Sequence, residues 1–286
     1  MKKLSIVLAT RNEQENLARC LESVKGFADE IIVVDEYSTD KTVEIAKKYG
    51  AKVFLEPHHA VFHITKQKAL DKATGEWVLQ LDADEVISDE LAKEIKLAIS
   101  HQSLAISPKK QRLFNRHQRL IENRDGLIGK KTGEIVGYFI ARRNMFLGKP
   151  LIHGGVYPDG VIRLVKNGKA HFPQKSVHEQ IELDGEVYWL SNDMLHYDSP
   201  TFERYLTRLN RYTDLQAVEL EENKVSKGFF GLFQYTIYKP LYTFLNLYIR
   251  HLGFLDGMRG FVWALFSSLR YPIAYFKYWV EKGKDK

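Results

Sequence analysis

Apolar runs alternate with helical patterns over the first 85 residues of the chain. Strand-like runs occur at residues 3–9, 30–34, 51–55 and 77–81. Between them, helical spacing of apolar residues and helix-end signals predict helices over about residues 17–24, 42–49 and 63–73. Strands that alternate with helices in this way form parallel sheets with right-handed crossovers. The pattern therefore predicts an α/β fold with a mostly parallel central sheet flanked by helices.

The regular alternation stops after one further predicted helix, from Ser88 to about Ile99, which has acidic residues in its first turn. Residues 107–131 are rich in Lys, Arg, Asn and Gln and show little periodicity, which predicts a mobile or substrate-facing loop region. Further strands, divided by Gly and Pro, are expected at residues 137–146, 160–166 and 187–190. These strands predict a mixed or antiparallel extension of the sheet.

Polar side chains follow three of the predicted parallel strands. Thr10, Asp35 and Asp82 each stand where a strand ends, and Asp84 follows Asp82 by two residues. The carboxyl ends of parallel strands meet at one sheet edge, where doubly wound folds bind nucleotides. Carboxylate oxygens there suit Mg²⁺ or Mn²⁺, with coordination positions left for the oxygens of a diphosphate. An acidic loop that caps the next helix is the alternative.

Two common phosphate-binding motifs are absent from the sequence. No Gly-x-Gly-x-x-Gly follows the first strand, and no Gly-x-x-x-x-Gly-Lys occurs anywhere. Dinucleotide-binding and P-loop chemistry are therefore disfavoured. A nucleotide bound without a glycine cradle needs other groups to neutralise its phosphates, and a metal on Asp84 with the nearby cation Lys66 would do so.

The bulk composition predicts a globular protein in a reducing compartment. The 286 residues are 44% hydrophobic and 27% charged, which is enough to bury a core. The single cysteine, Cys20, excludes a disulfide framework. The short apolar run after Met1 is too brief for a signal peptide, so a cytoplasmic protein is expected.

The net charge of +6 is concentrated in the last 60 residues. Residues 227–286 contain nine Lys and Arg against three Asp and Glu, and they hold 17 of the 35 Phe, Tyr and Trp residues. Charged residues and prolines interrupt every apolar stretch, so a spanning helix is not expected. The combination predicts amphipathic helices on an anionic membrane surface rather than nucleic-acid binding. A helical pair packed on the protein, or a homodimer formed through these helices, is the alternative.

Several segments resemble the sequence motifs of a known enzyme family. They are SIVLATRNEQENLARCLESV, IIVVDEYSTDKT, KQKALDKATGEWVLQLDADE, GGVYPDGVIRLVK, VHEQI and LHY. Together they resemble a family 2 glycosyltransferase with the GT-A fold, and most closely the bacterial envelope branch that includes the lipopolysaccharide core β-glucosyltransferases. The resemblance covers nearly the whole chain. It implies an inverting, metal-dependent transfer of a hexose from a nucleotide-diphosphate sugar, with a UDP-sugar expected, to a lipid-linked saccharide.

The resemblance also implies roles for individual residues. Positions that bind the nucleobase, ribose and diphosphate correspond to Thr10, Asn12, Asp35, Lys66 and Asp82. Asp84 corresponds to the metal ligand, and His196 to a histidine that some relatives add to the metal site, although a core histidine bonded to the backbone is equally compatible with the sequence. Glu179, beside His178, corresponds to the carboxylate that takes the acceptor proton.

Two departures from the family pattern lie near these positions. Glu36 and Tyr37 stand where the family often has Asp, Gly or Ser, and Lys66 and Gln67 stand where the branch commonly shows Arg-Asn. Charge is retained at residue 66, but the bidentate phosphate geometry of arginine is not.

The same resemblance sets the expected organisation of the chain. Residues 1–226 are expected to form the catalytic domain, with a nucleotide-binding half over about 1–100 and an acceptor half over about 101–226, and residues 227–286 a helical extension. Asp159 and Arg163 are expected either to border the acceptor pocket or to form a structural ion pair. The expected location is the inner face of a bacterial cell membrane. A sugar-phosphate nucleotidyltransferase and a non-catalytic membrane-associated binding protein are the alternative functions.

Overall fold

The computed structural model describes residues 3–100, 102, 105–173 and 181–280. It divides into two compact units. The first contains Met1–Arg142 and Pro158–His196, and the second contains Arg143–Tyr157 and Tyr197–Lys286. The functional division expected at residue 226 is a separate matter and stays a prediction.

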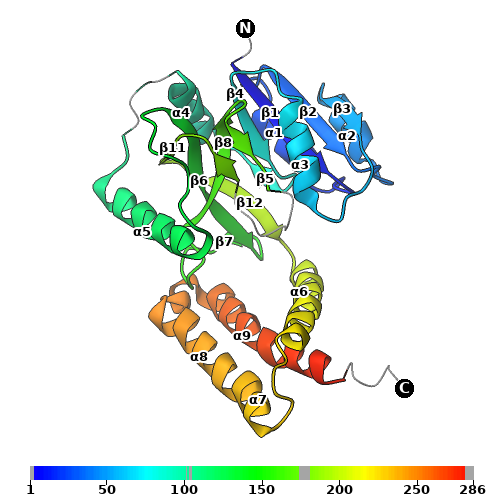
Figure 1. The fold of residues 1–286 in the computed structure, drawn as a ribbon, viewed down its shortest axis with the longest axis vertical. Coiled ribbons are helices and arrows are strands. Elements are labelled where there is room, and N and C mark those ends of the chain that lie inside the picture. Colours follow the sequence, from blue (N-terminus) through cyan, green and yellow to red (C-terminus); the bar gives the residue numbers. More distant parts are fainter. Residues whose placement is uncertain (1–2, 101, 103–104, 174–180, 281–286) are drawn as a thin grey trace. The chain divides into compact units, whose positions relative to one another are not determined.

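The first unit is built on a parallel sheet formed by the four predicted strands (Figure 1). They are β1 (Leu4–Thr10), β2 (Glu30–Asp35), β3 (Lys52–Leu55) and β4 (Trp77–Leu81), in the spatial order β3-β2-β1-β4. All three pairings are parallel. The register places Thr10 opposite Asp35 and Leu8 opposite Leu81, so the carboxyl ends of β2, β1 and β4 lie at one edge. The predicted α/β fold is confirmed.

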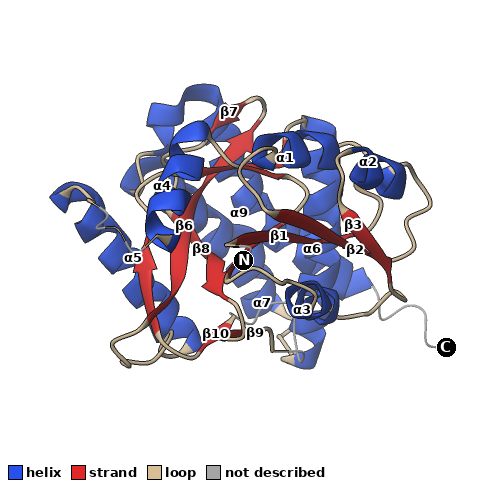
Figure 2. Ribbon diagram, turned by 90° about the horizontal axis from the view of Figure 1, so that it is seen from above, coloured by secondary structure: helices blue, strands red, loops and turns tan. Residues whose placement is uncertain are grey.

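Helices cover both faces of this parallel sheet (Figure 2). On one face, α1 (Leu17–Val24), α2 (Thr42–Lys48) and α4 (Asp89–Ile99) contribute Leu21, Ala46 and Leu91 to a core that they share with strand residues such as Ile6 and Leu79. On the other face, α3 (Phe62–Asp71) packs against β1 and β2. The apolar residues of β1 and β4 are therefore buried on both faces of the sheet.

The later strands extend the sheet, as the sequence predicts. In this extension, β8 (Asp159–Lys166) runs antiparallel to β4, and β6 (Ile135–Phe146) runs antiparallel to β8. Next to β6 lies β12 (Met194–Ser199), which pairs with β5 (Glu85–Val86). Smaller strands complete the sheets: β7 (Lys149–Pro150), β9 (Ala170–His171), β10 (Glu182–Leu183) and β11 (Glu186–Trp189). The sheet is therefore mixed beyond β4.

The predicted loop at residues 107–131 is wrong for most of its length, because Pro108–Asp125 form helix α5. Ser107 caps this helix through its side chain, which accepts from the amide of Lys110. Among its residues only Phe114 and Ile121 are buried. Two apolar anchors in 18 residues give little periodicity in the sequence. The Phe114 ring stacks on Trp189 at 4.3 Å between centroids, and this tertiary contact stabilises the helix.

The second unit is largely helical, and α9 packs against both α6 and α8 in it (Figure 1). Its elements are α6 (Phe202–Glu222), α7 (Phe229–Phe233), a π-helical turn (Gln234–Tyr238), α8 (Lys239–Leu245), a second π-helical turn (Asn246–Arg250), a 3₁₀ turn (Gly253–Asp256) and α9 (Gly257–Val280). The Lys277 ammonium joins α9 to α6 through the carboxylate of Asp214 at 2.5 Å. The predicted helical extension is confirmed. Within the described residues, none of the helices combines the length and apolar composition that crossing a membrane would require.

Candidate functional site

Three of the predicted nucleotide-binding residues meet at the ends of β1 and β2. The hydroxyl of Thr10 donates to the carboxylate of Asp35 at 2.9 Å, and the Ser38 amide donates to the same carboxylate at 2.7 Å. The side-chain oxygen of Asn12 accepts from the Thr39 amide at 2.9 Å. Asn12 has a φ of 53°, a left-handed conformation that asparagine tolerates better than most residues. Asp35 is fully buried, and its carboxylate holds the following turn in place by accepting from Ser38. Its contact with a nucleotide stays a prediction.

The second cluster surrounds Asp82 at the end of β4. One carboxylate oxygen lies 2.6 Å from the ammonium of Lys66, on α3, and the other accepts from the guanidinium of Arg163, on β8. Arg163 also donates to Glu85 at 2.6 Å and to the side chain of Gln80. The structure thus joins Lys66 and Asp82, two of the residues predicted to bind the nucleotide sugar, in an ion pair, and places Arg163 and Glu85 beside them.

Electrostatics keep Asp82 ionised. Burial alone would raise the pKa of Asp82, but the cations of Arg163 and Lys66 outweigh it and hold this pKa well below its ordinary value. Burial lowers the pKa of Lys66, against the opposing effect of Asp82. Arg163 is desolvated, yet the carboxylates of Asp82 and Glu85 raise its pKa further. A carboxylate flanked by two buried cations is therefore built into the end of the sheet.

Glu36, one of the two departures from the family pattern, anchors the neighbouring helix. Its buried carboxylate accepts from the hydroxyl of Thr65, one residue before Lys66 on α3, and lies 2.6 Å from Nδ1 of His58. The sequence motif alone gives no signal for this contact, since Glu36 and Thr65 lie 29 residues apart. Glu36 helps to fix where Lys66 sits.

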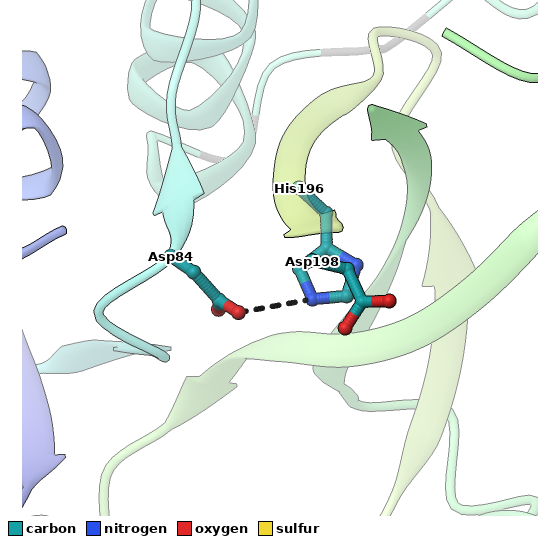
Figure 3. Close-up of side chains that lie close together, drawn as sticks. All are labelled: Asp84, His196 and Asp198. Atoms are coloured by element: carbon teal, nitrogen blue, oxygen red, sulfur yellow. Dashed lines mark ion pairs between the residues drawn. The ribbon is translucent and has the colours of Figure 1, made fainter. Parts of the chain in front are cut away.

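The third cluster contains the two predicted metal ligands. Nε2 of His196 lies 3.6 Å from a carboxylate oxygen of Asp84. The antiparallel pairing of β12 with β5 places His196 opposite Glu85 and so brings it beside Asp84. Asp198 follows two residues later on β12, and one donor atom from each of the three side chains lies within 4.8 Å of the others (Figure 3). The sequence analysis missed Asp198, although its two-residue spacing from His196 places both on one face of a strand.

The donor set fits a divalent cation. Two carboxylates and an imidazole are ligands for such ions, and three protein ligands leave open positions in an octahedral shell. The carboxylate oxygen of Asp84 and Nε2 of His196 are 3.6 Å apart, which is longer than a hydrogen bond. The distance is close to the separation of about 3 Å between neighbouring ligand atoms of an octahedral ion. The arrangement is compatible with a metal-ligand role for His196, and this role stays a prediction beside the core-histidine interpretation.

The remaining predicted residues have mixed outcomes. Asp159 and Arg163 are each in an ion pair, but not with one another: Asp159 lies 2.8 Å from Arg142, while Arg163 pairs with Asp82 and Glu85. The predicted catalytic base, Glu179, and its neighbour His178 lie outside the described residues. Their roles stay predictions.

Comparison with known proteins gives consistent matches. The model of a protein family described as Glycosyl transferase family 2 matches residues 5–155. An uncharacterized glycosyltransferase of Rickettsia typhi is 30% identical over 271 residues, which are 92% of this chain and 82% of that protein. The lipopolysaccharide core biosynthesis glycosyltransferase LpsC of Rhizobium meliloti is 26% identical over 281 residues, covering 93% of this chain and 91% of LpsC.

Among solved structures, one similar chain is that of S. aureus TarS 1-349 in complex with UDP-GlcNAc. It is 17% identical, with a TM-score of 0.45, and the match covers 96% of this chain and 83% of that chain.

Proposed function

This chain belongs to glycosyl transferase family 2, and from that premise we propose that it transfers a hexose from a UDP-sugar to a hydroxyl of a lipid-linked saccharide, with inversion at the anomeric carbon. The predicted family, the GT-A class of fold and the enzyme class are thereby confirmed. The family does not support the two alternative functions, a sugar-phosphate nucleotidyltransferase and a non-catalytic binding protein. The donor, the acceptor and the stereochemistry are the proposal.

The observation that carries the proposal is the grouping of Asp84 and His196 beside the Asp82 cluster at the end of β4. Asp82, whose carboxylate is paired with cations, and Asp84, the proposed metal ligand, are two residues apart and both follow the end of β4. A nucleoside diphosphate needs this combination, because its ribose hydroxyls bind carboxylates while its phosphates bind cations. In the proposal Thr10, Asn12 and Asp35 form the base and ribose side of the donor site.

We propose that Asp84 and His196 hold the divalent cation, with Asp198 as a third ligand. A divalent cation there would offset the negative charge that develops on the departing diphosphate. The imidazole nitrogen favours Mn²⁺ over Mg²⁺, because Mg²⁺ strongly prefers oxygen ligands and Mn²⁺ accepts nitrogen more readily. Lys66 adds a second positive charge on the diphosphate side.

The transfer itself requires a base on the acceptor side. The acceptor hydroxyl oxygen forms the new bond to the anomeric carbon as the bond to the diphosphate oxygen breaks on the opposite face. The hydroxyl proton passes to a carboxylate, and Glu179 is the candidate. This role follows from its match to the family's His-Glu pair.

The proposed acceptor is a lipid-linked saccharide of the bacterial cell envelope. LpsC, whose name assigns it to lipopolysaccharide core biosynthesis, matches this chain over most of both lengths. An acceptor of that kind would bring the enzyme to the cytoplasmic face of the inner membrane. The helical second unit is suited to a membrane surface, since many of its large apolar side chains are exposed.

The test is metal-dependent donor binding and transfer. Asp84→Asn keeps the size of the side chain and removes one ligand charge. We expect it to abolish the thermal stabilisation that Mn²⁺ and UDP-sugars together give the wild type, and to lower transfer at least about hundredfold. Asp71→Asn makes the same change at an exposed position on α3 and should behave as the wild type.

Transfer by Asp84→Asn at the wild-type rate would contradict the metal role. A screen of nucleotide sugars with the wild type, read as a rise in melting temperature with Mn²⁺ present, identifies the donor. Failure of every UDP-sugar to stabilise the protein would contradict the donor proposed here.

A further inference from the structure

The helical segment 229–250 of the second unit carries a continuous band of exposed apolar side chains. We call it the apolar band, and its members are Phe229, Phe233, Ile237, Leu241, Leu245 and Ile249. Each of these side chains is exposed by between 48% and 76%. Monomeric proteins rarely leave a contiguous apolar surface of this kind in water, so the band needs a partner.

The two π-helical turns keep the band on one face of the segment. Its members are spaced four residues apart, and in a regular α-helix each such step rotates the side chain by about 40°, or about 200° over five steps. The π-helical turns, Gln234–Tyr238 and Asn246–Arg250, have wider turns that advance each residue through a smaller angle. They therefore counteract the drift that would carry Ile249 to the opposite side from Phe229.

The other face of the segment is already packed against α9. Tyr235 is buried and its ring stacks on that of Tyr275 with 5.5 Å between centroids. The rings of Phe244 and Tyr248 both meet the edge or face of Phe261, at 5.9 Å and 5.8 Å. The apolar band is thus the side of the segment that faces away from α9.

Most of the basic side chains in this part of the unit are engaged in contacts within it. Two of them donate to backbone carbonyls: Lys227 to that of Tyr278 at 2.6 Å and Arg259 to that of Leu147 at 2.9 Å. The ammonium of Lys239 lies 3.7 Å from the centre of the Tyr235 ring. Lys277 forms an ion pair with Asp214. Among the described residues from 227 to 280, Arg250 and Arg270 are the exposed cations. In the described segment 229–250, the exposed large side chains are therefore mainly apolar, while the basic groups nearby are partly covered by their contacts.

We propose that the apolar band inserts into the boundary between headgroups and acyl chains of a lipid bilayer, and that apolar burial rather than attraction to anionic lipid supplies the binding. The proposal deepens the proposed function by naming the surface that meets the membrane of a lipid-linked acceptor. It revises the expectation, drawn from the net charge, that anionic lipid is the main attraction.

A bilayer fits the surface better than a second protein does. In the first turn Phe229, Phe230, Leu232 and Phe233 are all exposed, so apolar side chains project over a wide arc of the helix. A partner helix covers a narrower stripe, whereas a fluid lipid phase covers the whole arc. Tyr238 and Tyr242, both more than half exposed, combine an apolar ring with a hydroxyl and suit the headgroup level.

Vesicle flotation with the full chain tests the proposal. The wild type should bind vesicles of pure phosphatidylcholine, and raising the salt concentration should not release it. The variant Phe233→Ser/Ile237→Ser/Leu241→Ser should bind at least about tenfold more weakly. The control variant Leu206→Ser/Leu215→Ser/Val218→Ser replaces three exposed apolar side chains of α6 with serine and should bind as the wild type.

A second measurement does not depend on how the triple variant folds. Ile237→Cys, labelled with a polarity-sensitive fluorophore, should shift to shorter wavelength when phosphatidylcholine vesicles are added, and labelled Leu215→Cys should not. The native Cys20 is fully buried and should remain unlabelled. Donor-induced thermal stabilisation should be the same in all these variants, so failure of membrane binding and failure of the proposed reaction are read separately.

Three results would overturn the proposal. Binding that requires phosphatidylglycerol and is lost in high salt would make electrostatic attraction the main force. Equal binding by the two triple variants would place the membrane contact elsewhere. A wild-type dimer in light scattering that the band variant loses, with no vesicle binding by either, would assign the band to a second copy of the chain.

Discussion

The guanidinium of Arg163 donates to the carboxylate of Asp82, a residue 81 positions earlier in the chain. This contact joins the antiparallel extension of the sheet to the end of the central parallel strand. Arg163 also donates to Glu85, whose carboxylate accepts from the backbone amide of Asp82 at 2.9 Å. Asp82 is thereby fixed at both its side chain and its backbone.

We expect Arg163→Lys to disrupt this arrangement even though it keeps the charge. One ammonium cannot reproduce the fork of the guanidinium, which reaches Asp82, Glu85 and Gln80 together. The free energy of unfolding should fall by about 3 kcal/mol, and donor affinity should fall with it, because the carboxylate is no longer held. Urea unfolding and donor titration measure the two effects. Arg116→Lys, at an exposed position on α5, is the control, and equal stability of both variants would contradict the expectation.

Asp82→Asn should change how the stability of the protein depends on pH. In the folded state the pKa of Asp82 is held well below its ordinary value. The charge of Asp82 therefore contributes fully to the free energy of unfolding at pH values above the pKa of the unfolded state, which is about 4. This contribution is lost as the pH falls from there through the pKa of the folded state. At pH 7 the variant should be less stable by about 2 kcal/mol, since Lys66 and Arg163 then face a neutral amide.

This difference from the wild type should narrow as the pH is lowered below about 4. Urea unfolding over a series of pH values measures it, with Asp71→Asn as the control. A difference that stays constant down to about pH 3 would mean that the charge of Asp82 does not contribute in this way.

His196→Asp should change which metal the site prefers. The substitution replaces the imidazole nitrogen with a carboxylate oxygen, so the donor set beside Asp84 becomes entirely oxygen. We expect the ratio of the Mn²⁺ affinity to the Mg²⁺ affinity to fall by about tenfold, because Mg²⁺ prefers oxygen ligands to nitrogen ligands. The measurement is the rise in melting temperature with each metal and the donor. His171→Asp, at an exposed position, should leave the preference unchanged.

Phe114→Ala should destabilise the first unit, because the Phe114 ring is completely buried and anchors α5 against Trp189. The expected loss in the free energy of unfolding is about 3 kcal/mol, from lost apolar burial and the cavity left behind. Leu120→Ala on the same helix removes a side chain that is 59% exposed and should cost less than about 1 kcal/mol. Equal losses for the two variants would mean that α5 is not anchored through Phe114.

The sequence by itself determined the parallel half of the sheet and the positions of its polar ends. Apolar runs such as residues 30–34 and 77–81 are buried on both faces, so burial requires a hydrophobic run that can be read directly. Because parallel strands end at a common edge, the order of strands and helices was enough to bring Thr10, Asp35 and Asp82 to one place. The spacing of Asp82 and Asp84 at the strand end indicated Asp84 as a metal ligand, and the family motifs added His196; the structure places Asp84 and His196 side by side.

Only the tertiary structure decided which partner each charged or weakly patterned residue takes. The sequence could not tell whether Arg163 pairs with Asp159 or with Asp82, because register between distant strands decides it. The sequence pattern predicted a loop where α5 forms, because only two residues of this helix are buried and they give no helical periodicity of apolar residues. The sequence could not show that Lys227 contacts a backbone carbonyl, because the partner lies on the distant helix α9. In each case the deciding energy comes from contacts between residues far apart in the chain, which local patterns do not encode.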